Sequence, residues 1–273
     1  MYEEISRFYD SYGEREWARL EATAYGRIMY NCHMWFLSPH METGAKMLDA
    51  GCGSGRFSVP AAEAGCKLTL LDISERQLTI AENKMAEHGH SAYYINASVT
   101  DMNMLENNSF DVAVCYGAVL NYLHSGVSRA VAELYRVTKP GGYVVISVNS
   151  RAGVLRMAAS ELNMPFCDFW GDPDKWGIKS VVSTGDETDW PGATHPPRHY
   201  FISGELRRAM EEAGLRDIVT GAAPSVITGQ RKNAELAAAD KTAWNTLLYT
   251  ENKMFTEPGL ADAGEFILAK GRK

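Results

Sequence analysis

Three closely spaced glycines constrain this chain more than any other feature of its sequence. They stand in the segment Met47-Leu-Asp-Ala-Gly-Cys-Gly-Ser-Gly55, between a short apolar run and a helical pattern that contains Phe57, Val59 and Ala62. Because glycine has no Cβ, the backbone can turn tightly there and a ligand can approach its N–H groups. The segment therefore predicts a ligand-binding loop between a strand and a helix, the place where open α/β sheets bind small molecules.

The spacing of the three glycines distinguishes this loop from two common nucleotide-binding loops. It reads G-x-G-x-G, whereas dinucleotide enzymes carry G-x-G-x-x-G and phosphate-binding loops need a lysine. Asp49 precedes the glycines, and its charge would repel a pyrophosphate but suits a cationic group. Asp72 ends the next predicted strand, where a carboxylate can accept hydrogen bonds from ribose hydroxyls. Together these residues predict a site for a nucleoside that carries positive charge.

Apolar runs alternate with helical patterns from Met47 to Val148, which is typical of a parallel sheet with crossover helices. Ser74 and Gln77 have the spacing of a capping box at a helix start. A helix over 127–138 is predicted to end in the turn Lys139-Pro-Gly-Gly142, and the helix Ser203–Ala213 at Gly214. One further helix is predicted near 234–254. The predicted strands are Lys46–Ala50, Lys67–Leu71, Ala92–Asn96, Asp111–Cys115, Tyr143–Val148, Leu215–Val219 and Glu265–Ala269.

Composition and charge exclude several classes of protein. The 27 basic and 34 acidic residues give a net charge of −7, which disfavours nonspecific nucleic-acid binding. No apolar run approaches the roughly 18 residues of a membrane span, and Met1-Tyr-Glu-Glu lacks the pattern of a signal peptide. The five cysteines are scattered and form no C-x-x-C pair, and the histidines lack metal-ligand spacing. We therefore expect a soluble, cytoplasmic protein with reduced thiols, no metal site and no membrane partner.

The chain resembles the class I S-adenosylmethionine-dependent methyltransferases. The resemblance implies an α/β, Rossmann-like methyltransferase fold: a mostly parallel seven-stranded sheet flanked by helices, with N-terminal helices and an inserted lid. It also implies S-adenosylmethionine as the cofactor. The segments that carry the resemblance are Leu48-Asp-Ala-Gly-Cys-Gly-Ser-Gly55, Leu70-Leu-Asp72-Ile-Ser, Ser98-Val-Thr-Asp101-Met, Phe110-Asp-Val-Ala-Val-Cys-Tyr116 and Val137-Thr-Lys-Pro-Gly-Gly142.

The same resemblance suggests a division of the chain. With 273 residues we expect a single methyltransferase domain, 1–273. Residues 1–45, which are helical and aromatic in pattern, would form an N-terminal cap, and residues 46–150 the cofactor-binding core. Residues 151–200 combine aromatic residues with a long stretch of weak periodicity, as in a lid insertion. Residues 201–273 would complete the sheet.

Carried over position by position, the resemblance assigns roles around the cofactor. Asp49 would lie near its methionine amine, with Gly51 and Gly53 under its ribose and methionine part. Asp72 would hold the ribose hydroxyls, with Ile73 against the adenine. Many relatives have Asp or Asn where this chain has Ser98, so the adenine amino contact belongs either to Ser98 or to Asp101. The remaining cofactor-binding candidates are Cys52, Val99, Cys115, Tyr116 and, from the N-terminal helices, Arg27, which would reach the cofactor carboxylate.

Methyl transfer is a displacement at an activated methyl group, so the protein mainly aligns the reactants and excludes water. The segment Cys115-Tyr-Gly-Ala118 lacks the Asn/Asp-Pro-Pro-aromatic signature, which argues against a DNA amine N-methyltransferase. His199 and Tyr200 are candidates for a base or a substrate-binding pair, although a surface histidine beside a packed aromatic is the simpler interpretation. The substrate-binding candidates are Phe169, Trp170, Trp176 and His199.

Three functions remain open from the sequence. The first is a methyltransferase for a small-molecule acceptor, with direct displacement under a closed lid, and this is the one we expect. The second is a tRNA-modifying methyltransferase, because the carboxy-terminal layout is similar to an enzyme that esterifies carboxymethoxyuridine; the charge of −7 argues against it. The third is a noncatalytic S-adenosylmethionine-binding module.

Overall fold

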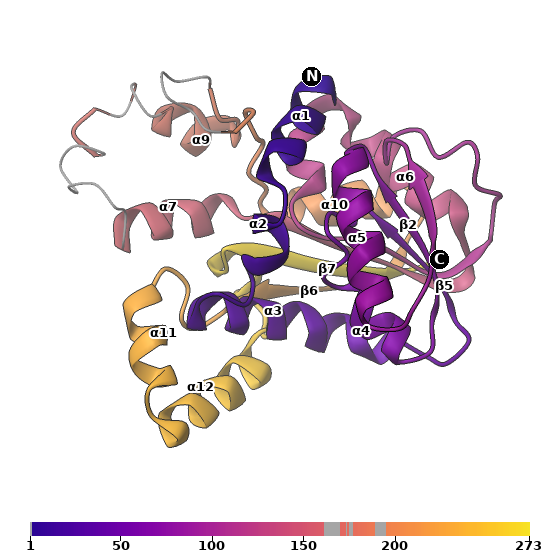
Figure 1. The fold of residues 1–273 in the computed structure, drawn as a ribbon. Helices are drawn as coiled ribbons and strands as arrows, with labels where there is room; N and C mark the ends of the chain where they lie inside the picture. Colours follow the sequence, from indigo (N-terminus) through magenta and orange to yellow (C-terminus); the bar gives the residue numbers. More distant parts are fainter. Residues whose placement is uncertain (1, 161–169, 173, 175–176, 189–194) are drawn as a thin grey trace.

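A seven-stranded sheet organises the chain in a computed structural model, which describes residues 2–160, 170–172, 174, 177–188 and 195–273 (Figure 1). The strand order is β3-β2-β1-β4-β5-β7-β6. All neighbours are parallel except β7, which runs antiparallel to both β5 and β6. The expected fold class is confirmed. The strands are β1 (Lys46–Ala50), β2 (Lys67–Asp72), β3 (Tyr93–Asn96), β4 (Phe110–Cys115), β5 (Thr138–Asn149), β6 (Arg216–Ala223) and β7 (Phe266–Arg272).

Helices cover both faces of the sheet because its central strands are apolar on both sides. In β1, Met47 packs into the cluster that also holds residues of α3, α4 and α5, whereas the next residue, Leu48, packs against α6 and α10. This alternation is the two-residue period of a strand. The described helices are α1 (Tyr2–Tyr12), α2 (Arg15–Ala18), α3 (Ala24–Leu37), α4 (Ser58–Glu63), α5 (Glu75–Glu87), α6 (Val127–Val137), α7 (Arg151–Ser160), α9 (Ile178–Thr184), α10 (Ser203–Glu212), α11 (Arg231–Ala238) and α12 (Lys241–Met254).

The expected capping box at the start of α5 forms only in part. The Ser74 side chain accepts a hydrogen bond from the Gln77 backbone N–H at 3.1 Å, as predicted. The Gln77 side chain does not return to Ser74, because the Ser74 N–H already donates to Asp72. Gln77 Nε2 instead donates to the backbone carbonyls of Tyr9 and Gly13 at 2.9 and 3.1 Å. This residue therefore fastens the C-terminal end of α1 to the core.

Two predictions of secondary structure are wrong. Lys139–Gly142 is not a turn before β5 but part of that strand, at an irregularity in its pairing with β4. The C-terminal residue holds it in the sheet: Gly141 N–H donates to the Lys273 carbonyl, and Lys273 N–H donates to the Gly142 carbonyl. The helix expected near 234–254 is two helices, α11 and α12, because Asp240 caps a new helix by accepting from the Ala243 N–H at 2.8 Å.

The α11–α12 pair packs on α3, outside the sheet layers (Figure 1). The α10 helix ends as predicted, with Gly214 in the left-handed region at φ +104°. Among the residues that the structure describes, no helix combines the length and the apolar character needed to cross a bilayer.

Candidate functional site

The glycine loop lies at the carboxyl end of β1, and its backbone requires glycine. Gly51, Gly53 and Gly55 have φ angles of +79°, +50° and +79°, in the left-handed region that other residues rarely adopt. The Gly51 N–H donates to the Leu71 carbonyl at 2.6 Å, so the loop is tied to the end of β2. A Cβ on Gly51 would lie 2.3 Å from a methyl group of Val119. The loop is therefore closely packed as well as tightly turned.

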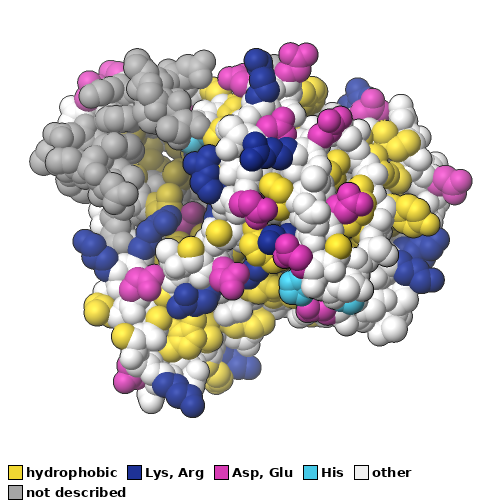
Figure 2. All heavy atoms as spheres, viewed as in Figure 1, with side chains coloured by type: hydrophobic (Ala, Val, Ile, Leu, Met, Phe, Trp, Pro, Cys, Tyr) yellow, Lys and Arg dark blue, Asp and Glu magenta, His cyan; other side chains and the backbone are white. Residues whose placement is uncertain are grey.

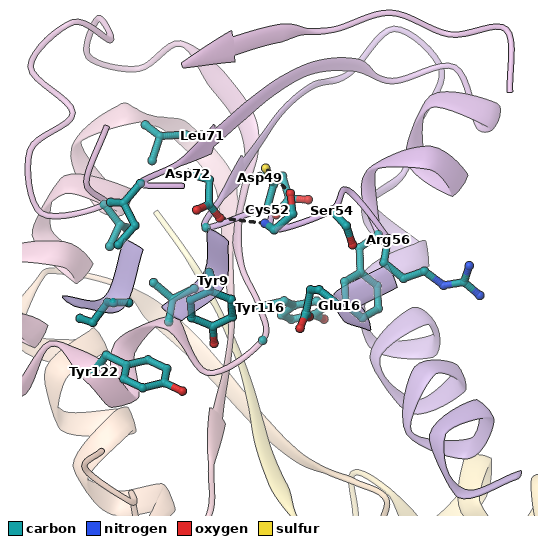
Figure 3. Close-up of a pocket in the computed structure, with 18 of the residues that line it drawn as sticks. Tyr9, Glu16, Asp49, Cys52, Ser54, Arg56, Leu71, Asp72, Tyr116 and Tyr122 are labelled. Carbon is teal, nitrogen blue, oxygen red and sulfur yellow. Dashed lines mark hydrogen bonds between the residues drawn. The ribbon is translucent and has the colours of Figure 1, made fainter. Parts of the chain in front are cut away.

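Asp72 connects the loop to the next helix. One carboxylate oxygen accepts from the Gly53 N–H at 2.8 Å (Figure 3). The other accepts from the Ser74 N–H at 2.9 Å. The side chain is buried, and burial raises the pKa of this carboxyl group to about 6, although both backbone hydrogen bonds work in the opposite direction. A carboxylate held in this way orders the loop and still faces the pocket.

Asp49 is the second buried carboxylate of the pocket. Its Oδ2 accepts from the Ser58 hydroxyl at 2.6 Å, and burial raises its pKa to about 6. Nearby, the Ser54 hydroxyl is buried, lines the same pocket and has no hydrogen-bond partner. A buried hydroxyl without a partner is costly. The loop therefore offers a ligand one free hydroxyl and two carboxylates that gain from a nearby positive charge.

One pocket brings together nine of the twelve cofactor-binding residues expected from the sequence. These nine come from the ends of β1, β2, β3 and β4, as expected for the carboxyl edge of an open sheet. Tyr116 is buried at this edge, and its hydroxyl donates to the His33 carbonyl at 3.2 Å. The nine are Asp49, Gly51, Cys52, Gly53, Asp72, Ile73, Ser98, Val99 and Tyr116.

Arg27 does not lie at the pocket. Its guanidinium lies over the Trp244 ring of α12, 5.5 Å from the ring centroid, and donates to the Glu21 carbonyl. Arg19 is the arginine of the N-terminal segment that lines the pocket, paired with both carboxylate oxygens of Glu16. Burial disfavours the charge of Arg19, but the Glu16 carboxylate outweighs it and raises the Arg19 pKa. Sequence reasoning missed Arg19 because it directly follows α2, a helix of only four residues that has no periodic pattern.

Cys115 and Asp101 also lie outside the pocket. The Cys115 side chain is fully buried in the core cluster on the α6 side of the sheet, and burial raises its thiol pKa. Asp101 is exposed beyond β3. Of the two candidates for the adenine amino contact, only Ser98 lines the pocket.

None of the described candidates for binding the methyl acceptor lines the cofactor pocket. Both ring nitrogens of His199 face carboxylates, Asp186 at 2.9 Å and Glu205 at 3.4 Å, in a separate surface hollow. His199 is therefore not positioned as a base for the cofactor pocket. Tyr200 is buried, and its hydroxyl lies 3.5 Å from the Glu187 carboxylate. Trp170 is half-buried, and Phe169 and Trp176 lie outside the described residues.

The N-terminal helices supply a wall of the pocket, and the sequence did not identify which of their residues form it. Tyr2, Ile5 and Tyr9 of α1 line the pocket together with Glu16 and Arg19. The aromatic content of residues 1–45 was the available signal, but it did not show which side chains face inward.

Two contacts hold α1 on the rim. The Ser6 hydroxyl donates to the Ile73 carbonyl at 3.1 Å, and the Ser74 hydroxyl donates to Asp10 at 2.5 Å. The helix therefore lies directly over the turn that follows Asp72. In the part of the chain that is described, no group of three or more His, Cys, Asp or Glu side chains is arranged to hold a metal ion.

Comparison with known proteins identifies the family. Residues 47–142, which contain the glycine loop and Asp72, match the family described as a methyltransferase domain. The chain contains a class I S-adenosylmethionine-dependent methyltransferase domain over residues 47–142. It is 35% identical over 104 residues to a malonyl-[acyl-carrier protein] O-methyltransferase of Serratia marcescens, which covers 38% of each chain. It is 34% identical over 174 residues to a ubiquinone biosynthesis O-methyltransferase of Nitrosospira multiformis, which covers 63% of each.

These matches span less than two thirds of either relative. A crystal structure from Thermotoga maritima, titled an S-adenosylmethionine-dependent methyltransferase and possible histamine N-methyltransferase, covers 100% of both chains. It shares 18% identity with a TM-score of 0.58, so it supports the fold.

The pocket fits the cofactor of this methyltransferase family. S-adenosylmethionine combines a nucleoside, an amino acid and a sulfonium cation. Asp72 lies where a ribose can be held, the pocket wall formed by Ile73 and Val99 is apolar, and Asp49 and the free Ser54 hydroxyl lie beside the glycines. Arg19, in place of Arg27, is the candidate for the cofactor carboxylate.

We expect the Asp72→Ala variant to bind S-adenosylmethionine about 1–3 kcal/mol more weakly, because it removes a ribose acceptor and leaves two loop N–H groups without a partner. Titration calorimetry measures the change. Asp111→Ala is the matched control: Asp111 also accepts a backbone N–H, from Lys46 at 2.8 Å, but at the other end of its strand. Equal affinity of both variants would contradict the assignment of Asp72.

The raised pKa values of Asp49 and Asp72 predict opposite pH effects on stability and binding. Each carboxyl group has a pKa of about 6 in the folded chain, against 3.8 for an aspartate that is free in water. Their contribution to folding is therefore fully present below about pH 4 and is lost as the pH rises through 6.

The binding of a cationic cofactor needs the ionised Asp49 carboxylate, so its affinity should fall about tenfold from pH 7.5 to pH 5. Calorimetry across this range checks the effect, and Asp49→Asn should flatten the profile. A pH-independent affinity would contradict it.

Proposed function

We propose that this protein is an S-adenosylmethionine-dependent O-methyltransferase that acts on a small molecule. The observation that carries the proposal is the continuity of one pocket, from the glycine loop and Asp72 to an aromatic end lined by Tyr9, Tyr116 and Tyr122. The names of the two relatives, both O-methyltransferases, favour an oxygen as the accepting atom. A compact aromatic acceptor fits such a pocket.

The residues of the chain would act mainly by positioning. When bound, S-adenosylmethionine supplies an activated methyl group that leaves the sulfonium sulfur as the bond to the acceptor oxygen forms, and a neutral thioether remains. Asp72 and the glycine loop fix the nucleoside end, and Tyr116 and Gly117 stand at the carboxyl end of β4. The apolar and aromatic walls exclude water, which keeps the reactants aligned.

The segment 151–200 would cover the acceptor as a lid. Its end is tied to the pocket wall: the His199 N–H donates to the Asn121 carbonyl at 2.7 Å, and the Asn121 side chain donates to the His199 carbonyl. Asn121 precedes the pocket residue Tyr122. This attachment would transmit closure of the segment to the acceptor end.

The charges on one face of the molecule favour a small acceptor over a polynucleotide. Acidic and basic side chains are interspersed on the face shown in Figure 2, without a broad basic region. A tRNA acceptor requires a positive surface that follows the phosphates.

Incubation with methyl-labelled S-adenosylmethionine and host extract, separated into small molecules, RNA and protein, tests the proposal. We expect the label in an alkali-labile ester or a stable ether of a small molecule. Label in RNA that disappears after ribonuclease treatment would overturn the small-molecule assignment. Cofactor binding without label in any fraction would favour a noncatalytic module.

A further inference from the structure

An ion pair in the wall of the cofactor pocket reaches from the glycine loop to the end of β4. Glu16 and Arg19 both line the pocket, and Glu16 is labelled in Figure 3. Arg19 Nε donates to both Glu16 carboxylate oxygens at 3.2 Å, and Arg19 Nη2 donates to Oε1 at 2.7 Å. The exposed fraction of the side chain is 17% for Glu16 and 28% for Arg19, so protein covers the pair only in part.

The negative and positive ends of this pair lie at different places in the pocket. Glu16 Cγ lies 3.4 Å from the position that a Cβ on Gly53 would occupy. Arg19 Nη2 lies 3.9 Å from the equivalent position on Gly117, just after β4. Glu16 therefore faces the glycine loop, and Arg19 faces the end of β4.

The nucleoside side of the pocket indicates which part of a bound cofactor would lie beside the pair. Ile73, Ser98 and Val99 line the pocket just after β2 and β3. Gly117 follows β4, which lies on the other side of β1 in the strand order. A cofactor with its adenine at Ile73 would therefore extend its amino acid end, which carries an ammonium and a carboxylate, toward the pair.

The pair has capacity for both of these charged groups without separating. An ionised carboxylate can accept about four hydrogen bonds, and Arg19 occupies three of these sites on Glu16. Arg19 Nη1 makes no hydrogen bond to the residues that the structure describes. An ammonium against Glu16 and a carboxylate against Arg19 would place charges of alternating sign side by side, which is favourable for all four groups.

We propose that Glu16 binds the ammonium of the cofactor's amino acid, and that the Glu16–Arg19 pair makes the pocket selective for nucleosides with a zwitterionic amino acid end. Asp49, which the family resemblance places near this amine, has Oδ2 engaged by the Ser58 hydroxyl at 2.6 Å. Glu16 adds a second carboxylate, from the N-terminal segment. The inference goes beyond the proposed function, because it concerns recognition of the cofactor and holds for any methyl acceptor.

Three adenosine ligands with different side arms test the inference by titration calorimetry. S-adenosylhomocysteine carries the complete amino acid, its decarboxylated analogue carries the amine alone, and methylthioadenosine carries neither group. Because the adenosine part is common to all three, methylthioadenosine reports whether a variant keeps an intact pocket. If the parent protein does not bind S-adenosylhomocysteine, the proposed function fails. If it does bind, the variants below test this inference alone.

We expect the parent protein to bind S-adenosylhomocysteine about tenfold or more tightly than methylthioadenosine. Glu16→Gln should bind the two amine-bearing ligands about tenfold more weakly and methylthioadenosine less than about threefold more weakly. Arg19→Met should lose about tenfold in affinity for S-adenosylhomocysteine, the one ligand with a carboxylate, and should not bind the decarboxylated analogue more weakly.

Glu21→Gln is the matched control for the loss of a carboxylate. Glu21 follows in the same N-terminal segment and pairs with the pocket residue Arg56 at 3.1 Å, but it is not among the described residues that line the pocket. This variant should bind all three ligands as the parent does.

Two results would overturn the inference. Unchanged or higher affinity of Glu16→Gln for the amine-bearing ligands would show that Glu16 only holds Arg19 in place. An equal loss of affinity for all three ligands would show that the pair supports the structure of the pocket and does not recognise the amino acid.

Discussion

The Gly51→Val variant should lose measurable S-adenosylmethionine binding and about 3 kcal/mol or more of folding stability. Two effects add at this position. A β-branched residue at φ +79° is strained by about 1–3 kcal/mol, and its Cβ would lie 2.3 Å from Val119, so the loop or the turn at Val119 must move. Since both segments line the pocket, the displacement reaches the cofactor site. Urea unfolding and calorimetry measure the two losses.

Gly89→Val is the matched control for backbone strain. Gly89 has φ +77°, close to that of Gly51, but a Cβ there meets nothing within 4 Å. Gly89→Val should therefore lose about 1–3 kcal/mol of stability and keep normal cofactor affinity. Equal losses of stability in the two variants, with normal cofactor binding in both, would contradict the inferred role of the packing between the loop and Val119.

The Glu251→Ala variant should lose about 3–5 kcal/mol of folding stability, although Glu251 lies outside the cofactor pocket. Its carboxylate is fully buried and accepts four hydrogen bonds: from the N–H and hydroxyl of Ser225 at 2.7 and 2.6 Å, and from the N–H groups of Val226 and Ile227 at 3.0 and 2.8 Å. Alanine leaves three backbone donors without this partner, and two of them, the N–H groups of Ser225 and Ile227, are buried, each at a cost of about 1–3 kcal/mol. Urea unfolding measures the loss.

Glu235→Ala provides the comparison for this variant. Glu235 is an exposed residue of α11 that accepts one hydrogen bond, from the Ala24 N–H at 2.7 Å. Its removal should cost about 1 kcal/mol. A loss in Glu251→Ala no larger than that in Glu235→Ala would show that the segment 225–227 finds other partners.

The nucleoside half of the site was accessible from the sequence because its determinants are local. Gly51 and Gly53 are recognisable as glycines at a strand-to-helix junction, and Asp72 stands at the end of the next strand. Parallel strands align their carboxyl ends at one edge of a sheet, so the fold class alone places these residues together. The same reasoning predicted seven strands, and the structure confirms them. The prediction of a turn at Lys139–Gly142 was wrong because the distant residue Lys273 supplies the backbone hydrogen bonds that hold this segment in the sheet.

The aromatic end of the pocket was decided by tertiary contacts. Gln77 reaches the Tyr9 carbonyl across 68 positions of sequence, and this contact sets which side of α1 faces the pocket. Tyr9, Arg19 and Tyr122 therefore line the site, whereas Arg27, on the neighbouring helix, lies over Trp244. The apolar stripe of a short amphipathic helix indicates that one face will be buried, but it does not indicate which part of the protein will cover that face.

The sequence by itself thus determined the sheet, the glycine loop and the carboxylates Asp49 and Asp72, since each follows from neighbouring residues and strand periodicity. Only the tertiary structure decided that Arg19 replaces Arg27 at the pocket, that both nitrogens of His199 face carboxylates in a separate hollow, and that the rings of Tyr9 and Tyr122 meet edge to face in the pocket. The physical reason is that side-chain contacts between segments far apart in sequence depend on how helices pack, which no local pattern encodes.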